Sequence, residues 1–276
     1  MYKLRNWVDI SKLDWNSLSA NPNAIQLLKE NQEKINWEHL SSNPNAIEML
    51  KENQHKINWK ILSGNENAIS LLKKNLNKID WGYLSINPNA IKLLKKNKNK
   101  INWNILTVNP NAISLLEKNK NKIHWHLLSH NPNAIDLITT TRKINWDMLS
   151  QNTNLNAIKL LKKNKNKINW DFMSKNENAI SLLKKNQDKI NWEYLSMNKN
   201  AISLLKKNQD KINWEYLSGN PNIFTYDYIK IKENMKNSGI KNELMAFIFN
   251  PKNMNKWIDW GFSEHIQMLN FINKKK

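Results

Sequence analysis

Three histidines in one short stretch are the residues whose types and spacing first suggest chemistry. His126 and His130 are four residues apart, a spacing that places two side chains on one face of a helix, where they could share a metal ion. His124 precedes them by two residues, but the nearest carboxylate in the sequence, Asp136, lies six residues beyond His130. We therefore interpret the histidines as surface residues, and we expect no metal site and no cofactor.

The rest of the composition argues against catalysis. The chain has no cysteine, which excludes thiolate metal sites and cysteine nucleophiles, and its five glycines form no phosphate-binding loop and no nucleophile turn. No paired carboxylates in an apolar setting and no grouping of Ser, His and Asp has the spacing that acid–base or nucleophilic chemistry requires. The sequence therefore predicts that the protein is not an enzyme.

Positive charge is abundant and unevenly placed. Lys and Arg number 43 against 23 Asp and Glu, a formal net charge of +20. Residues 15–58 carry four Lys and five Glu (net −1), whereas residues 81–124 carry eight Lys and one Glu (net +7). Many of these lysines lie where a helix is expected to end, and we expect them to be solvated and to line one basic edge: Lys95, Lys96, Lys98, Lys100, Lys118, Lys120, Lys122, Lys162, Lys163, Lys165 and Lys167.

Two interpretations of this basic edge remain open. A basic stripe could attract nucleic acid, an acidic protein or an anionic membrane surface. Alternatively, the abundance of Lys, Asn and Ile reflects the codon bias of an AT-rich genome. The only arginines are Arg5 and Arg142, so base-specific reading of DNA, which commonly uses arginine, is not expected.

These residues are positioned by an internal repeat that fills the chain. The unit that begins at Trp37 reads WEHLSSNPNAIEMLKENQHKIN, and the period is 22 residues apart from steps of 21 and 24 around Trp146. Ten tryptophans head the ten units: Trp15, Trp37, Trp59, Trp81, Trp103, Trp125, Trp146, Trp170, Trp192 and Trp214.

Each unit predicts two short helices. Asn43 and Pro44 are typical of a helix start, because Asn caps free N–H groups and Pro fits the first turn. Asn53 is expected just past the end of that helix, in the left-handed conformation that Asn tolerates. Asn58 is expected to cap a second, shorter helix that begins at Trp59.

Helices of this length are marginal alone and must pack on the next copy. The sequence therefore predicts an all-α fold, an elongated α-solenoid of about ten 22-residue two-helix repeats roughly 90 Å long. We expect one continuous domain with an N-terminal cap (residues 1–14), the solenoid (residues 15–222) and a helical C-terminal cap (residues 223–276). The tryptophans could form a platform for stacked bases or sugars, but they recur in step with Leu and Ile, which favours a structural core of Trp37, Trp59, Trp81, Trp103, Trp125, Trp170 and Trp192.

Copies differ at a few positions, and specificity can reside there. The fifth residue after each Trp mixes apolar, charged and small types, which indicates an exposed variable ridge or a lightly constrained surface; its members include Ile86, Val108, His130, Lys175 and Met197. The period also breaks at residues 137–142, one residue short, and at residues 152–156, two residues long. Neutral drift in loops is the favoured interpretation, with a bend or a contact point as the alternative.

The unit WxxLSxNPNAIxLLKKNxxKIN resembles the tandem 22-residue Trp/Asn-Pro repeats of giant, AT-rich DNA viruses of the mimivirus type. The stretch from Asn220 through Trp257 and Asp259 is similar to the C-terminal pattern of such proteins. A looser similarity, through the LSxNP turn, exists to leucine-rich variant repeats. The resemblance implies a solenoid fold and a viral origin, but no activity and no binding residues.

We therefore expect a non-enzymatic scaffold that binds another protein, from the host or the virus. Non-specific binding of nucleic acid through the basic edge and a structural role in the virion are the alternatives. No apolar run is long enough to span a membrane, and residues 1–14 lack the apolar segment of a signal peptide. The expected location is intracellular, in the host cytoplasm or viral factory, or in the virion.

Overall fold

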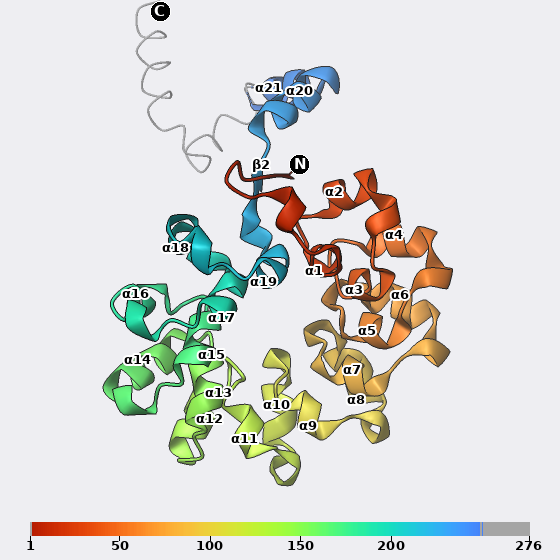
Figure 1. Ribbon diagram of the computed structural model, residues 1–276. Helices are drawn as coiled ribbons and strands as arrows, with labels where there is room; N and C mark the ends of the chain where they lie inside the picture. Colours follow the sequence, from red (N-terminus) through yellow and green to blue (C-terminus); the bar gives the residue numbers. More distant parts are fainter. Residues whose placement is uncertain (1, 249, 251–276) are drawn as a thin grey trace, which may run out of the picture. The chain divides into compact units, whose positions relative to one another are not determined.

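The computed structural model describes residues 2–248 and residue 250. The described residues form two compact units: residues 2–225 form the larger, and residues 226–248 and 250 belong to the smaller. The larger unit contains the repeats, and within it two kinds of short helix alternate along the chain (Figure 1). The expected all-α fold of stacked helix pairs is confirmed.

The first helix of each unit begins at the repeat tryptophan. These first helices are α1 (Trp15–Ala20), α3 (Trp37–Leu40), α5 (Trp59–Gly64), α7 (Trp81–Ile86), α9 (Trp103–Leu106), α11 (Trp125–Leu128), α13 (Trp146–Gln151), α15 (Trp170–Lys175), α17 (Trp192–Met197) and α19 (Trp214–Ser218).

Nine second helices follow them: α2 (Ile25–Glu30), α4 (Ile47–Glu52), α6 (Ile69–Lys74), α8 (Ile91–Lys96), α10 (Ile113–Glu117), α12 (Ile135–Thr140), α14 (Leu155–Lys163), α16 (Ile180–Leu183) and α18 (Ile202–Lys207). In Figure 1, α1, α3, α5 and α7 lie nearer the centre of the arrangement, and α2, α4, α6 and α8 lie outside them.

Short 3-10 turns connect the helices. Turns between a second helix and the next Trp are η2 (Gln32–Lys34), η3 (Gln54–Lys56), η5 (Leu76–Lys78), η7 (Lys98–Lys100), η9 (Lys120–Lys122), η10 (Lys165–Lys167), η11 (Gln187–Lys189) and η13 (Gln209–Lys211), and η1 (Ile10–Lys12) precedes Trp15. Turns inside a unit are η4 (Glu66–Ala68), η6 (Pro88–Ala90), η8 (Pro110–Ala112), η12 (Lys199–Ala201) and η14 (Pro221–Ile223).

The caps explain these boundaries and correct two expectations. Asn58 caps α5 as expected, because its side chain accepts a hydrogen bond from the backbone N–H of Ile61 at 3.1 Å. Asn43 instead accepts from the N–H of Asn45, and α4 begins only at Ile47. Asn53 is not left-handed: its φ is −126°, and its amide donates to the carbonyl of Met49, four residues back, at 3.0 Å. A side chain, rather than a left-handed residue, thus satisfies the helix end.

The core is a continuous cluster from Val8 to Phe224, and leucines fill its centre. Leu62 and Leu72, one from each helix of a unit, are completely buried. The tryptophans expected to be the structural core are only half-buried and pack against this cluster from outside: Trp37, Trp59, Trp81, Trp103, Trp125, Trp170 and Trp192. Burial of the leucine and alanine side chains supplies the main apolar driving force.

A buried asparagine from each unit links it to the unit before. The amide of Asn65 donates to the backbone carbonyls of Ser41 and Asn43 at 3.1 and 2.9 Å. All ten units repeat this pair of bonds through Asn21, Asn43, Asn65, Asn87, Asn109, Asn131, Asn152, Asn176, Asn198 and Asn220. We call this set the asparagine ladder, and it satisfies carbonyl groups that would otherwise be buried without partners.

A buried hydroxyl makes a second link between units. Ser63 Oγ donates to the carbonyl of Trp59 at 2.8 Å and accepts at 3.0 Å from the N–H of Asp80, the residue that caps the first helix of the next unit. Thr107 performs the same role in α9, donating to Trp103 and accepting from His124.

The repeats close into a ring, which corrects the expected elongated rod. Helix α19 of the last unit packs against α1 of the first. The amide of Asn21 donates to the carbonyls of Ser218 and Asn220 at 2.8 and 3.0 Å, and the N–H of Asp14 donates to Ser218 Oγ at 2.8 Å. The same kinds of bond join all the remaining pairs of neighbouring units. The last unit therefore packs on the first as any unit packs on its neighbour.

The N-terminal segment completes the tenth unit instead of capping an open end. Turn η1 and Lys12 occupy the place that a 3-10 turn and its last lysine occupy elsewhere, and Lys12 Nζ lies 5.2 Å from the ring centre of Trp214. Strand β1 (Tyr2–Leu4) pairs with strand β2 (Phe224–Tyr226), and the N–H of Arg5 donates to the carbonyl of Ile223 at 2.9 Å. Residues 2–13 and 223–225 thus belong to the same compact unit as the repeats.

The irregular stretch keeps the register of the ring. Asn152 still donates to the carbonyls of Ser129 and Asn131 at 2.9 and 3.0 Å. The missing residue is absorbed at Arg142, whose φ is 56°, and the two additional residues lengthen α14 to nine residues. Within residues 137–156 the length changes are thus confined to turns and to one second helix.

The smaller unit contains α20 (Tyr228–Asn237) and α21 (Ile240–Ile248), which pack against each other. The remainder of the expected C-terminal cap, including Trp257 and the terminal lysines, lies outside the described residues. A C-terminal cap is not needed to cover the last repeat, because α1 already covers it. In the described part of the chain, no helix has the length and apolarity needed to cross a bilayer.

Candidate functional site

The exposed side of the first helices carries the positions at which the copies differ. The residues one, two and five places after each Trp lie there, and we call this surface the first-helix face. Its fifth-place residues are the variable ridge. Here the structure places Ile86 (42% exposed), Met197 (37% exposed), exposed Lys175, and half-buried Val108 and His130.

Neighbouring units contact each other across this face. A Cβ added at Gly64 would lie 3.6 Å from Cγ2 of Ile86, so fifth-place residues of adjacent units are in contact range. Lys60 and Lys175 each lie over a tyrosine of the following unit, 5.3 Å from the ring centre of Tyr83 and 6.0 Å from that of Tyr194. Variable positions of neighbouring units are therefore in contact at several points on this face.

The later units carry aromatic rings and acids on this face. Tyr194 and Tyr216 stack with ring centres 6.4 Å apart. The charge of the Glu193 carboxylate and a hydrogen bond to it raise the pKa of Tyr216. Glu193 and Glu215 belong to a run of four acids one place after the Trp of units seven to ten, which also includes Asp147 and Asp171.

His130 is the one titratable member of the variable ridge with an altered environment. Burial, and secondarily the positive charge of Lys175, lower its pKa. Its Nδ1 is buried without a hydrogen-bond partner. His124 and His126 instead contact each other edge to face at 6.2 Å. Among the described residues, no three His, Cys, Asp or Glu side chains come together as metal ligands could.

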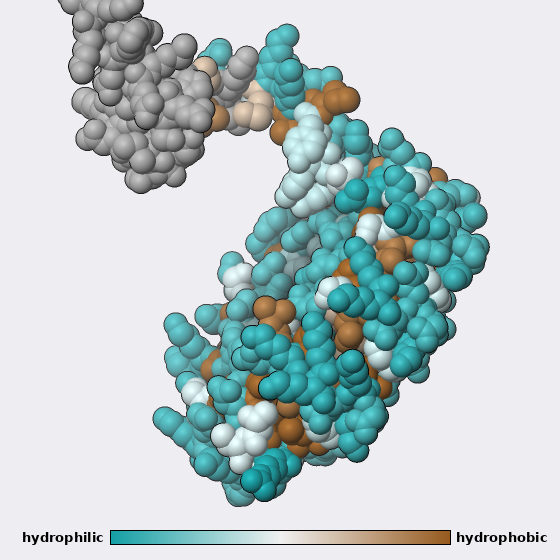
Figure 2. Space-filling view, turned by 90° about the vertical axis from the view of Figure 1, so that its left-hand side faces the viewer, coloured by the Kyte–Doolittle hydropathy of each residue, from teal (hydrophilic) through white to brown (hydrophobic). Residues whose placement is uncertain are grey.

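The basic edge predicted from the sequence is exposed throughout. Its residues end the second helices or lie in the turns that follow: Lys95, Lys96, Lys98, Lys100, Lys118, Lys120, Lys122, Lys162, Lys163, Lys165 and Lys167. The side of the ring seen in Figure 2 is accordingly mainly hydrophilic, with apolar side chains in small patches.

Two lysines of the basic edge are not simply solvated. Lys100 Nζ lies 4.7 Å from the ring centre of Trp81, and Lys122 Nζ lies 4.6 Å from that of Trp103. The lysine three places before a repeat Trp stacks on the Trp of the preceding unit in nine pairs, through Lys12, Lys34, Lys56, Lys78, Lys100, Lys122, Lys143, Lys189 and Lys211. The tryptophan faces are thus covered by ammonium groups, which argues against a platform for stacked bases.

Sequence reasoning missed the asparagine ladder and the lysine–tryptophan stacks. The signal was present, since Lys occurs three places before every repeat Trp and Asn six places after every one. Comparison of the chain with protein-family models, with curated proteins and with solved structures finds no match. The viral resemblance therefore stays an expectation.

Proposed function

We propose that the ring is a non-enzymatic scaffold that binds a segment of another protein along its first-helix face. The observation that carries the proposal is the set of exposed, copy-variable apolar and aromatic side chains on this face. Tyr83, Ile86 and Met197 are between 37% and 42% exposed. Exposed aromatic and methionine side chains are enriched at the centres of protein interfaces.

The geometry of the ring supports a scaffold. Ten units held in register by buried hydrogen bonds give a preorganised surface, which lowers the entropic cost of binding an extended partner. The viral resemblance and the intracellular or virion location belong to this proposal, with a host or viral protein as the partner.

Site-specific photo-cross-linking in cells that naturally contain the protein tests the proposal. A cross-linking residue at Ile86 or Met197 should give one discrete adduct. The matched control is the same residue at Leu76, which is 55% exposed in turn η5 and lies off the first-helix face. The adduct formed from position 86 should disappear when Met197 is changed to Glu. Likewise, the adduct formed from position 197 should disappear when Ile86 is changed to Glu. Equal labelling from Leu76 would contradict the proposal.

Non-specific binding of nucleic acid through the basic edge is the second candidate. The observation that favours it is that none of the eleven lysines belongs to an ion pair in the described part of the chain, where the ion pairs include Lys51–Glu48 and Lys199–Glu177. Phosphate contacts by uncompensated lysines would give affinity without sequence preference.

Fluorescence anisotropy with random duplex DNA and single-stranded RNA, at 50 and 200 mM salt, tests this candidate. Binding should weaken steeply with salt, and replacing Lys118, Lys120, Lys162 and Lys165 by Gln should weaken it further. Absence of binding at 50 mM salt would leave the lysines without a role in nucleic-acid binding.

A further inference from the structure

The ring has one break in its tenfold repetition. After α19, the tenth unit continues through η14 into β2, so no second helix follows in that unit. The place beside α18 is lined instead by the two strands and by the residues that follow β1. Residues outside the repeat pattern gather there, including Arg5, one of two arginines, and Trp7, a tryptophan outside the 22-residue frame.

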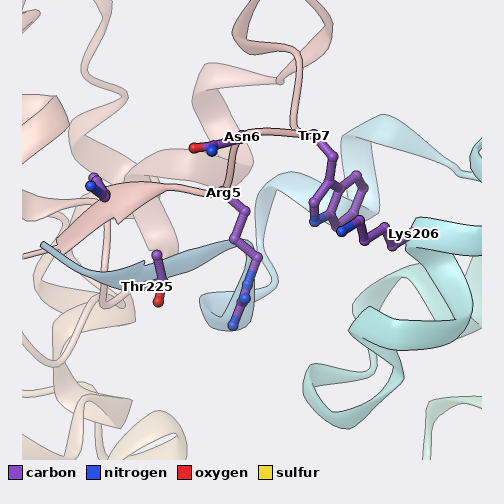
Figure 3. Close-up of a pocket in the computed structure, with 6 residues that line it drawn as sticks. Arg5, Asn6, Trp7, Lys206 and Thr225 are labelled. Carbon is purple, nitrogen blue, oxygen red and sulfur yellow. The ribbon is translucent and has the colours of Figure 1, made fainter.

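A pocket of about 450 Å³ lies at this place. Its lining residues are Lys3, Arg5, Asn6, Trp7, Lys206 and Thr225. Figure 3 shows the indole of Trp7 beside the side chain of Lys206, and Arg5 and Thr225 extending to the same side of the strands. We call it the seam pocket.

Arg5 and Trp7 are held in place by the ring. Arg5 Nε donates to the carbonyl of Asn222 at 2.7 Å, which fixes the position of the guanidinium. Trp7 is half-buried and packs against the core cluster, so one part of its ring system is anchored while another lines the pocket. These two side chains therefore need little ordering when a ligand binds.

The charge of the pocket selects for anions. Three of its six residues are cationic, none is acidic, and Asn6 and Thr225 add neutral hydrogen-bonding groups. Guanidinium and ammonium groups bind phosphate oxygens through charge-assisted hydrogen bonds, and an indole provides a flat surface on which a base can stack. A volume of about 450 Å³ is within the range of small-molecule sites.

We propose that the seam pocket binds a mononucleotide, with its phosphate held among Arg5, Lys206 and Lys3 and its base against Trp7. This site is independent of the first-helix face and of the basic edge. Its recognition elements occur once in the ring, because only the seam lacks a second helix.

Isothermal titration calorimetry with AMP and with inorganic phosphate tests the proposal on the full-length chain. AMP should bind at one site per chain, about tenfold more tightly than inorganic phosphate because only AMP has a base to stack. Lys206→Gln should weaken AMP binding about tenfold or more through loss of a charge-assisted bond. Trp7→Leu should remove the preference for AMP over phosphate.

Lys184→Gln is the matched control. Lys184 occupies the same repeat position as Lys206, and the carbonyl of each accepts a hydrogen bond from the glutamine three residues later at 3.2 Å. It lies one unit earlier, where the following second helix is present, so this change should leave AMP binding unaltered. Equal weakening by both variants would show binding to the basic surface in general and would overturn the proposal. So would the absence of AMP binding at 50 mM salt, or equal affinities for AMP and phosphate.

Discussion

At the scale of single residues, the fold depends on buried amides and hydroxyls as much as on leucine. Asn109 is completely buried, and its amide donates to the carbonyls of Ser85 and Asn87, both at 2.9 Å. A buried amide with both donors used contributes to stability only while its acceptors are in place. The contribution of an asparagine to stability therefore depends on its position in the unit.

Asn109→Asp should lower the free energy of unfolding by about 3–5 kcal/mol, because a carboxylate would face two carbonyl oxygens in a buried site. Asn111→Asp is the control, since the amide of Asn111 is exposed and donates to the backbone carbonyl of Pro88. Its cost should be about 1 kcal/mol. Urea unfolding of the two variants measures the difference, and equal costs would contradict the role of the asparagine ladder.

His130 gives the ring a pH dependence of calculable sign. Its pKa is lowered in the folded state by burial and by Lys175, so the unfolded chain binds its proton more readily. The stability from neutral His130 is complete above the unfolded pKa of about 6.5 and is lost as the pH falls below it. Thermal unfolding between pH 7.5 and 5 should therefore show a smaller decline for His130→Gln than for the unmodified chain. Identical pH profiles would contradict this.

At the scale of elements, a lysine that stacks on a tryptophan joins the turn before the next repeat Trp to the first helix of the same unit, in nine of the ten units. Lys98 and Lys100 belong to the same turn, η7, and are both exposed, but only Lys100 lies over a ring, that of Trp81. Exposure alone did not distinguish these two lysines.

Lys100→Gln should cost about 0.5–1 kcal/mol through loss of a cation–π contact at an exposed site. Lys98→Gln should change the melting temperature little, because that side chain has no such partner. Differential scanning fluorimetry of the two variants in parallel compares them directly. A greater loss for Lys98→Gln would show that the stack on Trp81 does not stabilise the turn.

Much of the element scale could be predicted from the sequence. The 22-residue period, the first helices beginning at Trp and the role of Asn58 all followed from spacing and from capping chemistry. The conformation of Asn53 did not, because two ways of satisfying a helix end use the same residue type. The half-burial of the tryptophans did not follow either, since recurrence in step with Leu does not show which face of the indole is exposed to solvent.

At the scale of the whole repeat array, closure was the feature that the sequence pattern could not predict. Whether a stack of units closes depends on a small rotation between neighbours, summed over ten copies. The residues that join the ends, such as Asp14 and Ser218, are of the types that join neighbouring units elsewhere in the ring. For that reason the sequence carries no separate mark of closure, and the seam pocket could not be foreseen.

Fluorescence energy transfer across the seam tests closure. Dyes at Glu30, the end of α2, and Lys207, the end of α18, should be roughly 20 Å apart if two units separate them around the ring, and roughly 80 Å apart on an open rod. Transfer should therefore be high in the full-length chain and fall when residues 2–12 are removed, since these residues supply η1, Lys12 and β1. Low transfer in the intact chain would contradict the ring.

Closure in register also affects how the gene can change. An open solenoid can gain a copy by tandem duplication and simply become longer. In the ring, Asn21 must meet the carbonyls of Ser218 and Asn220, and an eleventh copy would alter the angle at which the ends arrive. A change of one or two residues within a turn or a second helix is accommodated, as residues 137–156 demonstrate. We therefore expect gain or loss of a whole 66-nucleotide copy to open the seam, because the summed rotation between units would no longer bring the two ends together.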